Sequence, residues 1–321
     1  MSASRDVRLR PGFALVAALA MLLAVSVLAL ELGEVARARR LAAANALDRA
    51  AAAAAAEAGV DEAYARLADQ LRQAYLSQFR TQTTIENPWA GAARLHLGPS
   101  PLGSQWYEVT ARDVGTALNL NTASGDGLRR LLSTLAVSGD RADRIAQALL
   151  DWRDADDSRR PNGAERAEYL RLGAPVLPGN APLRGVAELR HVAGMSDDLY
   201  ERLRPYVTVD GSGRVNLNGA PAPVLLALPG MTDESVRLVM RYRIAGRRVA
   251  SVNALAAELS PLARQRLTDA LPALLAGTTT DTREVLVTST ASSGDGVARV
   301  RAEALLVYDR ELRVAWRRTS P

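Results

Sequence analysis

An apolar segment near the start of the chain, residues 13–30, constrains the fold more than any other feature of the sequence. It runs for eighteen residues without a charged side chain, which is close to the shortest length with which an α-helix crosses a bilayer. Three arginines precede it, at positions 5, 8 and 10. By the positive-inside rule we expect a single-pass anchor, with the N-terminal tail in the cytoplasm, residues 13–32 in the membrane and the rest of the chain on the opposite side.

The sequence after the apolar segment continues the helix. From Glu31 to Arg80 there is no proline, and only Gly33 and Gly59 interrupt a run of Ala, Leu, Arg and Glu, which are strong helix formers. A cleaved secretory signal is the alternative, but its apolar core normally spans about 7–15 residues and ends at a cleavage site. We therefore expect one helix over residues 13–80, partly in the membrane and partly outside it.

Short alternating runs on both sides of a helical block predict a small sheet. Residues 93–97 and 105–114 are typical of strands, and three more strands are predicted between Thr282 and Arg318. The block between them, residues 117–277, is mostly helical in pattern. The predicted fold class is α+β, in which a long N-terminal helix packs on an antiparallel sheet formed by residues 81–116 and 278–321, with an all-α domain inserted between the two parts.

Three stretches of the helical block, residues 131–153, 188–207 and 225–243, share the pattern of a helix-hairpin-helix unit. In DNA-binding versions of this unit a Gly-x-Gly hairpin and the next helix N-terminus hold a phosphate group. Here acidic residues begin the second helix of each unit, at Asp140, Asp197, Asp198, Asp233 and Glu234. Such residues cap the helix and repel phosphate. We expect a packing module and no nucleic-acid partner; a membrane-anchored DNA-binding protein of the competence type is the alternative.

The loop that begins at Asp151 is strongly acidic and suggests a calcium site. Asp154, Asp156, Ser158 and Glu165 fall at positions one, three, five and twelve of an EF-hand-like spacing, and calcium prefers such oxygen ligands. The match is partial, because an arginine stands where the EF-hand needs glycine. The alternative is a solvated loop whose acids pair with nearby arginines. Catalysis is not expected, since the chain has no cysteine and its two histidines, His96 and His191, are far apart.

Several stretches, taken together and in order, resemble a known family. The junction "RPGF" before the apolar segment is similar to the processing site of type IV pilin-like subunits. Further along, the chain resembles the K-type minor pseudopilins of the type II secretion system in the stretches "LNLNTAS", "DWRDADD", "PNGAE", "ELRHVAGM" and "VNLNGAPAPVLLALPGM". The resemblance covers nearly the whole chain after residue 12. It implies a pilin-like fold with a large helix-hairpin-helix-like domain inserted in the sheet.

The same resemblance implies how the N-terminus is processed. A prepilin peptidase would remove residues 1–12 by cutting between Gly12 and Phe13, and the new amine of Phe13 would be methylated. Most pilin-like subunits carry Glu as the fifth mature residue, whereas this chain has Ala17. A carboxylate at membrane depth is costly without a partner, and in pilin-like filaments the N-terminal amine of the subunit ahead supplies that partner. Alanine is therefore expected in a subunit with no neighbour ahead of it.

The resemblance also implies a role, partners and a ligand. Family members assemble with the I-type and J-type minor pseudopilins at the tip of a periplasmic filament of the major pseudopilin, in the inner membrane of Gram-negative bacteria, and help to initiate this filament for protein export. They bind calcium in the helical domain, which implies Asp151, Asp154, Asp156 and Glu165 as ligands here. They are not enzymes. An insert of this size would clash with a subunit stacked above it, which is consistent with a place at the tip.

Overall fold

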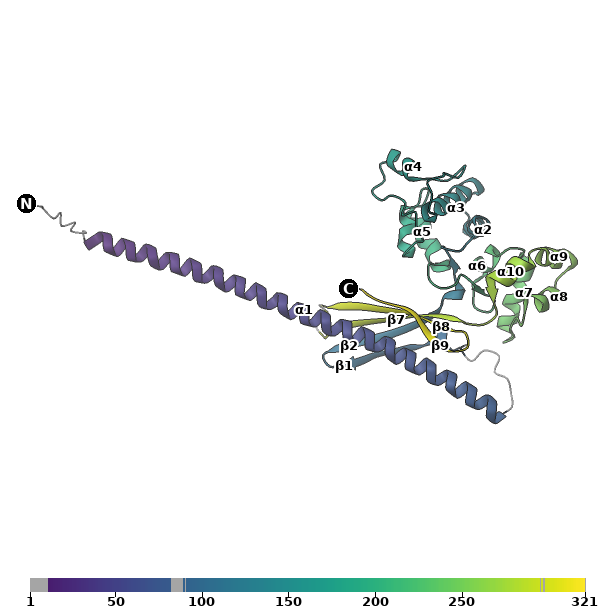
Figure 1. Cartoon of the computed structure of the whole chain (residues 1–321), viewed down its shortest axis with the longest axis horizontal. Coiled ribbons are helices and arrows are strands. Elements are labelled where there is room, and N and C mark those ends of the chain that lie inside the picture. The colour runs from purple at the N-terminus through teal and green to yellow at the C-terminus, as the bar shows by residue number, and fades with distance from the viewer. Residues whose placement is uncertain (1–10, 82–88, 90, 295, 297, 321) are drawn as a thin grey trace, which may run out of the picture.

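A computed structural model of the chain describes residues 11–81, 89, 91–294, 296 and 298–320, and it describes no side chains for residues 11–14 and 78–81. Most of the predicted leader, residues 1–10, lies outside the described residues. One helix, α1 (Pro11–Thr81), accounts for the whole of the predicted helical region. Every described side chain from Leu15 to Leu47 is exposed, and this half of α1 extends away from the rest of the molecule (Figure 1). By length and composition it is the one described helix that is apolar enough to cross a membrane.

The second half of α1 packs on a five-stranded antiparallel sheet. Its strands are β1 (His96–Leu102), β2 (Gln105–Asp113), β7 (Glu284–Ser293), β8 (Arg299–Tyr308) and β9 (Leu312–Ser320), in the spatial order β1-β2-β7-β8-β9. Small residues let the helix approach the sheet closely. Ala52, Ala55, Ala56 and Ala63 are fully buried or nearly so, and a Cβ added to Gly59 would lie 2.3 Å from the Ser289 hydroxyl.

The predicted strand at residues 93–97 is partly wrong. Residues Ala92–Arg94 form a turn of 3₁₀ helix, and the strand begins only at His96. The reason is the burial of Ala92, which has no exposed surface. The chain must turn there, with Arg94 N–H donating to the Gly91 carbonyl, before it can reach the edge of the sheet.

Between β2 and β7, which are neighbours in the sheet, the chain leaves to form a helical insert with its own hydrophobic core. The predicted insert, residues 117–277, begins shortly after the end of β2 at Asp113 and ends shortly before the start of β7 at Glu284. The helices of the insert are α2 (Gly125–Thr134), α3 (Gly139–Arg153), α4 (Arg166–Arg171), α5 (Asp197–Leu203), α6 (Ala222–Ala227), α7 (Asp233–Ile244), α8 (Val252–Ala257), α9 (Pro261–Asp269) and α10 (Leu271–Gly277). Short 3₁₀ helices at Val114–Thr116, Val186–His191 and Arg204–Tyr206 complete it.

The insert consists of two halves built on the same plan. Each half begins and ends with a two-residue strand, and these two strands pair in parallel. They are β3 (Leu118–Asn119) with β4 (Val207–Thr208) in the first half, and β5 (Val215–Asn216) with β6 (Thr278–Thr279) in the second. In the first half the Asn121 side chain accepts from Leu183 N–H at 2.8 Å and donates to the Leu183 carbonyl at 3.0 Å. In the second half Asn218 makes the same two bonds to Val249, at 2.8 and 2.9 Å.

The two halves also match in an arginine near the end of the longest helix of each half, α3 and α7. Arg243 of α7 donates to the carbonyls of Leu217 and Ala220, and Arg153 of α3 donates to the two matching carbonyls of the first half. The halves differ in the segment after this arginine. Only five residues separate Arg243 from Val249, whereas residues 154–182, here called the excursion, separate Arg153 from Leu183. The acidic loop is thus an addition to a repeated unit.

All three predicted hairpins are present, and each turns through a residue with positive φ. These residues are Ala136 (58°), Gly194 (84°) and Gly230 (70°). In each case the residue two positions later, Ser138, Ser196 or Thr232, is the N-cap of the next helix. The shared geometry explains the sequence pattern, because a tight turn into a capped helix needs both features.

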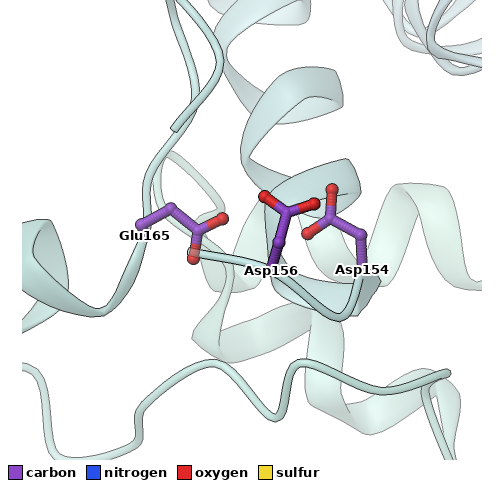
Figure 2. A group of neighbouring side chains, drawn as sticks. All are labelled: Asp154, Asp156 and Glu165. Atoms are coloured by element: carbon purple, nitrogen blue, oxygen red, sulfur yellow. The ribbon is translucent and has the colours of Figure 1, made fainter. Parts of the chain in front are cut away.

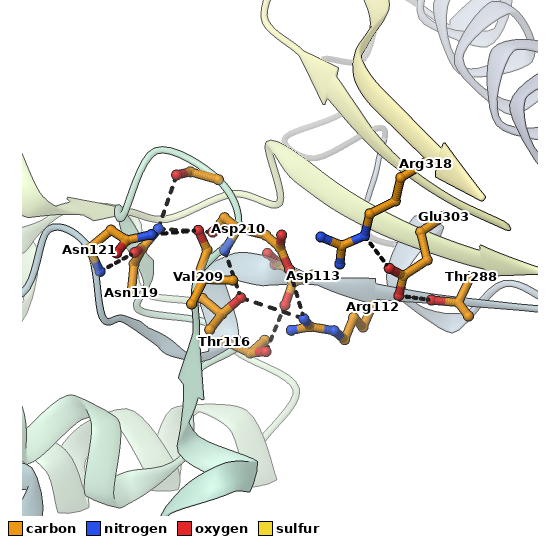
Figure 3. A network of polar contacts seen from close by, with 12 residues as sticks. Arg112, Asp113, Thr116, Asn119, Asn121, Val209, Asp210, Thr288, Glu303 and Arg318 are labelled. Carbon is orange, nitrogen blue, oxygen red and sulfur yellow. Dashed lines mark hydrogen bonds and ion pairs between the residues drawn. The ribbon is translucent and has the colours of Figure 1, made fainter. Parts of the chain in front are cut away.

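Buried polar contacts fix the insert to the sheet where the chain leaves β2. The Asp113 carboxylate accepts from Gly115 N–H at 2.8 Å, Asn216 Nδ2 at 2.8 Å and Thr282 Oγ1 at 2.9 Å. It therefore joins the segment that leaves the sheet to the segment that returns. Burial raises the pKa of Asp113, and the hydrogen bonds lower it in part. Figure 3 shows the adjoining network, in which Arg112 of β2 reaches Asp210 of the insert at 3.4 Å.

Candidate functional site: an acidic cluster in the excursion

Three carboxylates converge where α3 ends and α4 begins. Asp154 is the C-cap of α3 and Glu165 is the N-cap of α4, so the two helices bring the ends of the acidic loop together. Asp156 lies between them, and one carboxylate oxygen from each residue lies within 4.8 Å of the other two. Figure 2 shows the three carboxylates turned toward one another. These residues were all predicted as calcium ligands.

Glu165 is the most constrained member of this acidic cluster. Its side chain is 3% exposed, and neither of its carboxylate oxygens has a hydrogen-bond partner among the described residues. Burial raises the pKa of Glu165 to about 7, and the negative charges of Asp151 and Asp154 contribute to the same shift. Asp154 Oδ1 is also buried without a partner. Buried carboxylates without partners are costly unless a proton or a cation neutralises them, so the cluster fits a cation with oxygen ligands.

Asp151, the fourth predicted ligand, lies outside the three-carboxylate cluster. It is fully buried, and its Oδ1 accepts from Arg160 Nη1 at 2.5 Å. The same Nη1 atom donates to Asp154 Oδ2 at 2.5 Å. These bonds raise the pKa of Arg160. The loop therefore has features of both predicted alternatives, a calcium site and a loop whose acids pair with arginines. Asp151 and Asp154 pair with Arg160, whereas the Glu165 oxygens have no partner among the described residues.

Residues that the sequence patterns did not single out hold the loop in place. Asn162 N–H donates to Gln147 Oε1 at 2.9 Å, and Asn162 Nδ2 donates to Asp143 at 2.7 Å. Both partners lie on α3, so the loop is tied back to this helix. Gly163 is needed for a close approach, because a Cβ added there would lie 2.0 Å from Asp151 Oδ2.

An aromatic group lies beside the acidic cluster. Trp152, next to Asp151 in the sequence, is 1% exposed and contacts Tyr169 edge-on, with ring centroids 5.3 Å apart. Burial raises the pKa of Tyr169 to about 12, with smaller contributions from Asp151 and Glu165. Trp152 thus packs against a ring whose pKa is affected by two carboxylates of the acidic loop.

Acidic residues at two of the three hairpins have structural partners. In the third hairpin the Glu234 carboxylate accepts from both Ser260 N–H and Ser260 Oγ at 2.7 Å, and so holds the start of α9. In the second, Asp198 pairs with Arg202 at 3.1 Å. Carboxylates at these positions interact favourably with the helix dipole, and their negative charge disfavours phosphate.

Comparison with known protein families identifies the segment that carries the cluster. Residues 113–211, which include all four predicted ligands, match the family model described as type II secretion system (T2SS), protein K. This segment is therefore similar to the protein K family. The chain is 32% identical to the type II secretion system protein K of Klebsiella pneumoniae over 203 residues, which cover 58% of this chain and 60% of that protein. It is 38% identical to the protein K of Pectobacterium carotovorum over 123 residues, 36% of this chain and 37% of that protein.

The sequence matches thus span only about a third to three-fifths of these relatives, whereas the structural match extends further. A chain of the GspK-GspI-GspJ complex from the enterotoxigenic Escherichia coli type 2 secretion system superposes with a TM-score of 0.55. The superposition covers 80% of this chain and 94% of that chain, at 24% sequence identity. The likeness in fold therefore extends to most of the chain, beyond the segment that the family model matches.

Proposed function

We propose that this protein is a minor pseudopilin of the type II secretion system that caps the tip of the periplasmic pseudopilus and helps to initiate its assembly for protein export. The observation that carries the proposal is the position of the insert between the neighbouring strands β2 and β7. The insert projects from the end of the sheet, away from the exposed half of α1 (Figure 1). A filament subunit stacked on this end would collide with it.

The arrangement of α1 and the sheet supports a type IV pilin-like interpretation of the fold. The exposed half of α1 would lie in the inner membrane before assembly and among neighbouring helices afterwards, with the N-terminus cytoplasmic and the sheet and insert in the periplasm of a Gram-negative bacterium. Ala17 lies exposed on this half. It leaves no carboxylate that needs a neighbour's amine at membrane depth. The role is structural, and it needs no catalytic residue.

The partners of this role are the I-type and J-type minor pseudopilins, on which the major pseudopilin would then assemble. We expect the full chain, purified in detergent, to form a complex with both subunits that elutes as one species in size-exclusion chromatography. A duplex DNA of mixed sequence at low salt serves as the control ligand. A chain that binds the DNA tightly and neither subunit would contradict the proposal and favour the competence-type alternative.

Processing at the N-terminus is expected to precede assembly. Co-expression with a prepilin peptidase should yield a chain that begins at Phe13 and carries a methyl group on its α-amine, which intact-mass and N-terminal peptide analysis would detect. A Gly12→Leu variant should stay uncleaved, because the bulky side chain obstructs the peptidase at the residue before the cut. Cleavage at another bond, or equal cleavage of the variant, would refute this assignment.

The acidic cluster supports calcium as a structural ligand of the insert. Asp154, Asp156 and Glu165 supply carboxylate oxygens, and calcium takes 6–8 oxygen ligands in flexible geometry. Asp151 adds a buried negative charge and orients the loop through Arg160. The chain has no cysteine and therefore no disulfide, so ion binding and packing are the means by which the excursion can be held to the repeated core.

A further inference from the structure

The two edge strands of the five-stranded sheet, β1 and β9, differ in how well they are protected against the addition of a further strand. Along β1, Pro99 and Pro101 lack an N–H group, and the register shifts between Leu97 and Ser100. Prolines and bulges of this kind block the addition of another strand. The opposite edge, β9, has one register shift, opposite Leu305 and Leu306 of β8, but it runs for nine residues without a proline. Its outer backbone groups face no other strand in the described part of the chain.

The charge of β9 selects the kind of strand that could pair with this open edge. Residues 312–320 contain Arg313, Arg317 and Arg318 and no acidic residue. Pairing of two β9 edges would bring these arginines from two copies together, and like charges on facing strands are destabilising. The edge is thus protected against a second copy of the same chain but not against a strand of opposite charge.

One of these arginines is free to meet such a strand. Arg317 pairs with Asp61 of α1 at 2.7 Å, and Arg318 pairs with Glu303 of β8 at 2.6 Å (Figure 3). Arg313 is exposed and makes no ion pair with any described residue. It lines a cleft of about 620 Å³ between the end of the sheet and the insert, which leaves room for a side chain from a neighbouring molecule.

The acidic groups of this cleft are mostly engaged already. Asp113 accepts its three hydrogen bonds, Asp281 pairs with Arg248 at 2.8 Å, and Glu284 accepts from Ser212 N–H at 2.8 Å. Asp309 remains in the lining, together with Arg283. The lining has four carboxylates and three arginines, Arg214, Arg283 and Arg313, and Arg248 pairs with one of the carboxylates. A further carboxylate at Arg313 would therefore not meet a net negative charge.

We propose that the β9 edge binds an extended strand with acidic side chains from a neighbouring minor pseudopilin, which would add a sixth strand to the sheet. Main-chain hydrogen bonds would supply affinity, and contacts of acidic side chains with Arg313 would set specificity. This inference rests on the proposed function, because it needs the assembly with the I-type and J-type subunits. It assigns the contact to an edge of the sheet rather than to the helices.

Hydrogen–deuterium exchange of the full chain in detergent, alone and in complex with both subunits, tests this proposal. Backbone amides of β9 that face outward should exchange at least tenfold more slowly in the complex, while amides of β8, which are already paired on both sides, should not change. An Arg313→Glu variant should weaken assembly at least tenfold. The matched control, Arg299→Glu at the exposed start of β8, should leave it unchanged.

The outcomes separate this inference from the proposed function. A complex that forms with unchanged exchange in β9 overturns the inference alone, as does equal assembly of the Arg313 and Arg299 variants. Failure of any complex to form overturns the proposed function and the inference with it. Association of two copies of this chain through β9, detected as a dimer with protected β9 amides, would also overturn it.

Discussion

Calcium should stabilise the full chain against unfolding by about 2.7 kcal/mol when its concentration is one hundred times the dissociation constant, and a Glu165→Gln variant should lose this gain. The expectation comes from the two Glu165 oxygens, which are buried without hydrogen-bond partners among the described residues. A divalent cation would neutralise them, whereas the amide of glutamine has no charge to neutralise. Thermal unfolding in detergent, with calcium or with a chelator, measures the difference.

The same variant should have the opposite effect on the metal-free protein. At pH 8 an ionised, unpaired Glu165 destabilises the folded state, so Glu165→Gln should raise the melting temperature in chelator while it abolishes the response to calcium. Asp157→Asn is the matched control, because it removes one negative charge from the same loop outside the three-carboxylate cluster and should keep most of the response. A calcium response that persists in the Glu165 variant would refute the assigned site.

The pH dependence of the metal-free protein has a defined sign. The pKa of Glu165 is about 7 in the folded chain, well above the ordinary value of about 4.3 in an unfolded chain. Between these values the folded state keeps a proton that the unfolded state has lost, so stability should fall as the pH rises through this window. Protons and calcium compete for the same carboxylate, so calcium affinity should weaken below pH 7.

Terbium offers an independent measurement of the same site. This ion commonly replaces calcium at oxygen ligands, and the buried indole of Trp152 would sensitise its luminescence. A signal that calcium displaces, and that weakens between pH 7.5 and pH 5.5, is expected from the wild-type chain. Affinity that stays constant over this range would show that Glu165 does not take part in binding.

The sequence was sufficient to predict features that depend on local patterns. Uninterrupted helix formers predicted α1, alternating runs predicted most strands, and the spacing of the acids predicted the cluster of Asp154, Asp156 and Glu165. The diversion of Asp151 to Arg160 could not be foreseen, because four arginines within reach in the sequence offered equally good partners. Only the folded loop, with Gly163 packed against Asp151, determines which of them the carboxylate meets.

The duplication of the insert shows a similar limit. The letters "NLN" occur at residues 119–121 and again at 216–218, and each long helix has an arginine near its end. Their hydrogen-bond partners, Leu183 and Val249, share no sequence pattern and lie at different distances along the chain. The two halves have backbone geometry in common, since Asn121 and Asn218 bond to main-chain groups that any residue provides. Sequence patterns cannot report such a partner.

The hairpin at Gly230 should tolerate a side chain poorly, because helix backbone surrounds it. We expect Gly230→Ala to lower the free energy of unfolding by about 3 kcal/mol. About 1–2 kcal/mol of this loss comes from placing a side chain at positive φ, and the rest comes from crowding in a packed core. The added Cβ would lie 2.5 Å from the Arg266 carbonyl oxygen and 2.6 Å from Ala270 Cβ at the end of α9, and backbone atoms of a helix cannot turn aside as a flexible side chain can.

Gly246→Ala separates the two contributions, because Gly246 also has a positive φ, 68°, but has no atom within 4 Å of an added Cβ. Its loss should be limited to about 1 kcal/mol of backbone strain, and denaturant titration of both variants in detergent measures the difference. Ala136 supports this expectation, since the first hairpin already has alanine at φ 58°. Equal losses in the two variants would mean that the hairpin at Gly230 is not packed against α9. A larger loss at Gly230 would identify close helix packing as the reason for glycine there, the same glycine that in DNA-binding versions of the motif leaves room for a phosphate.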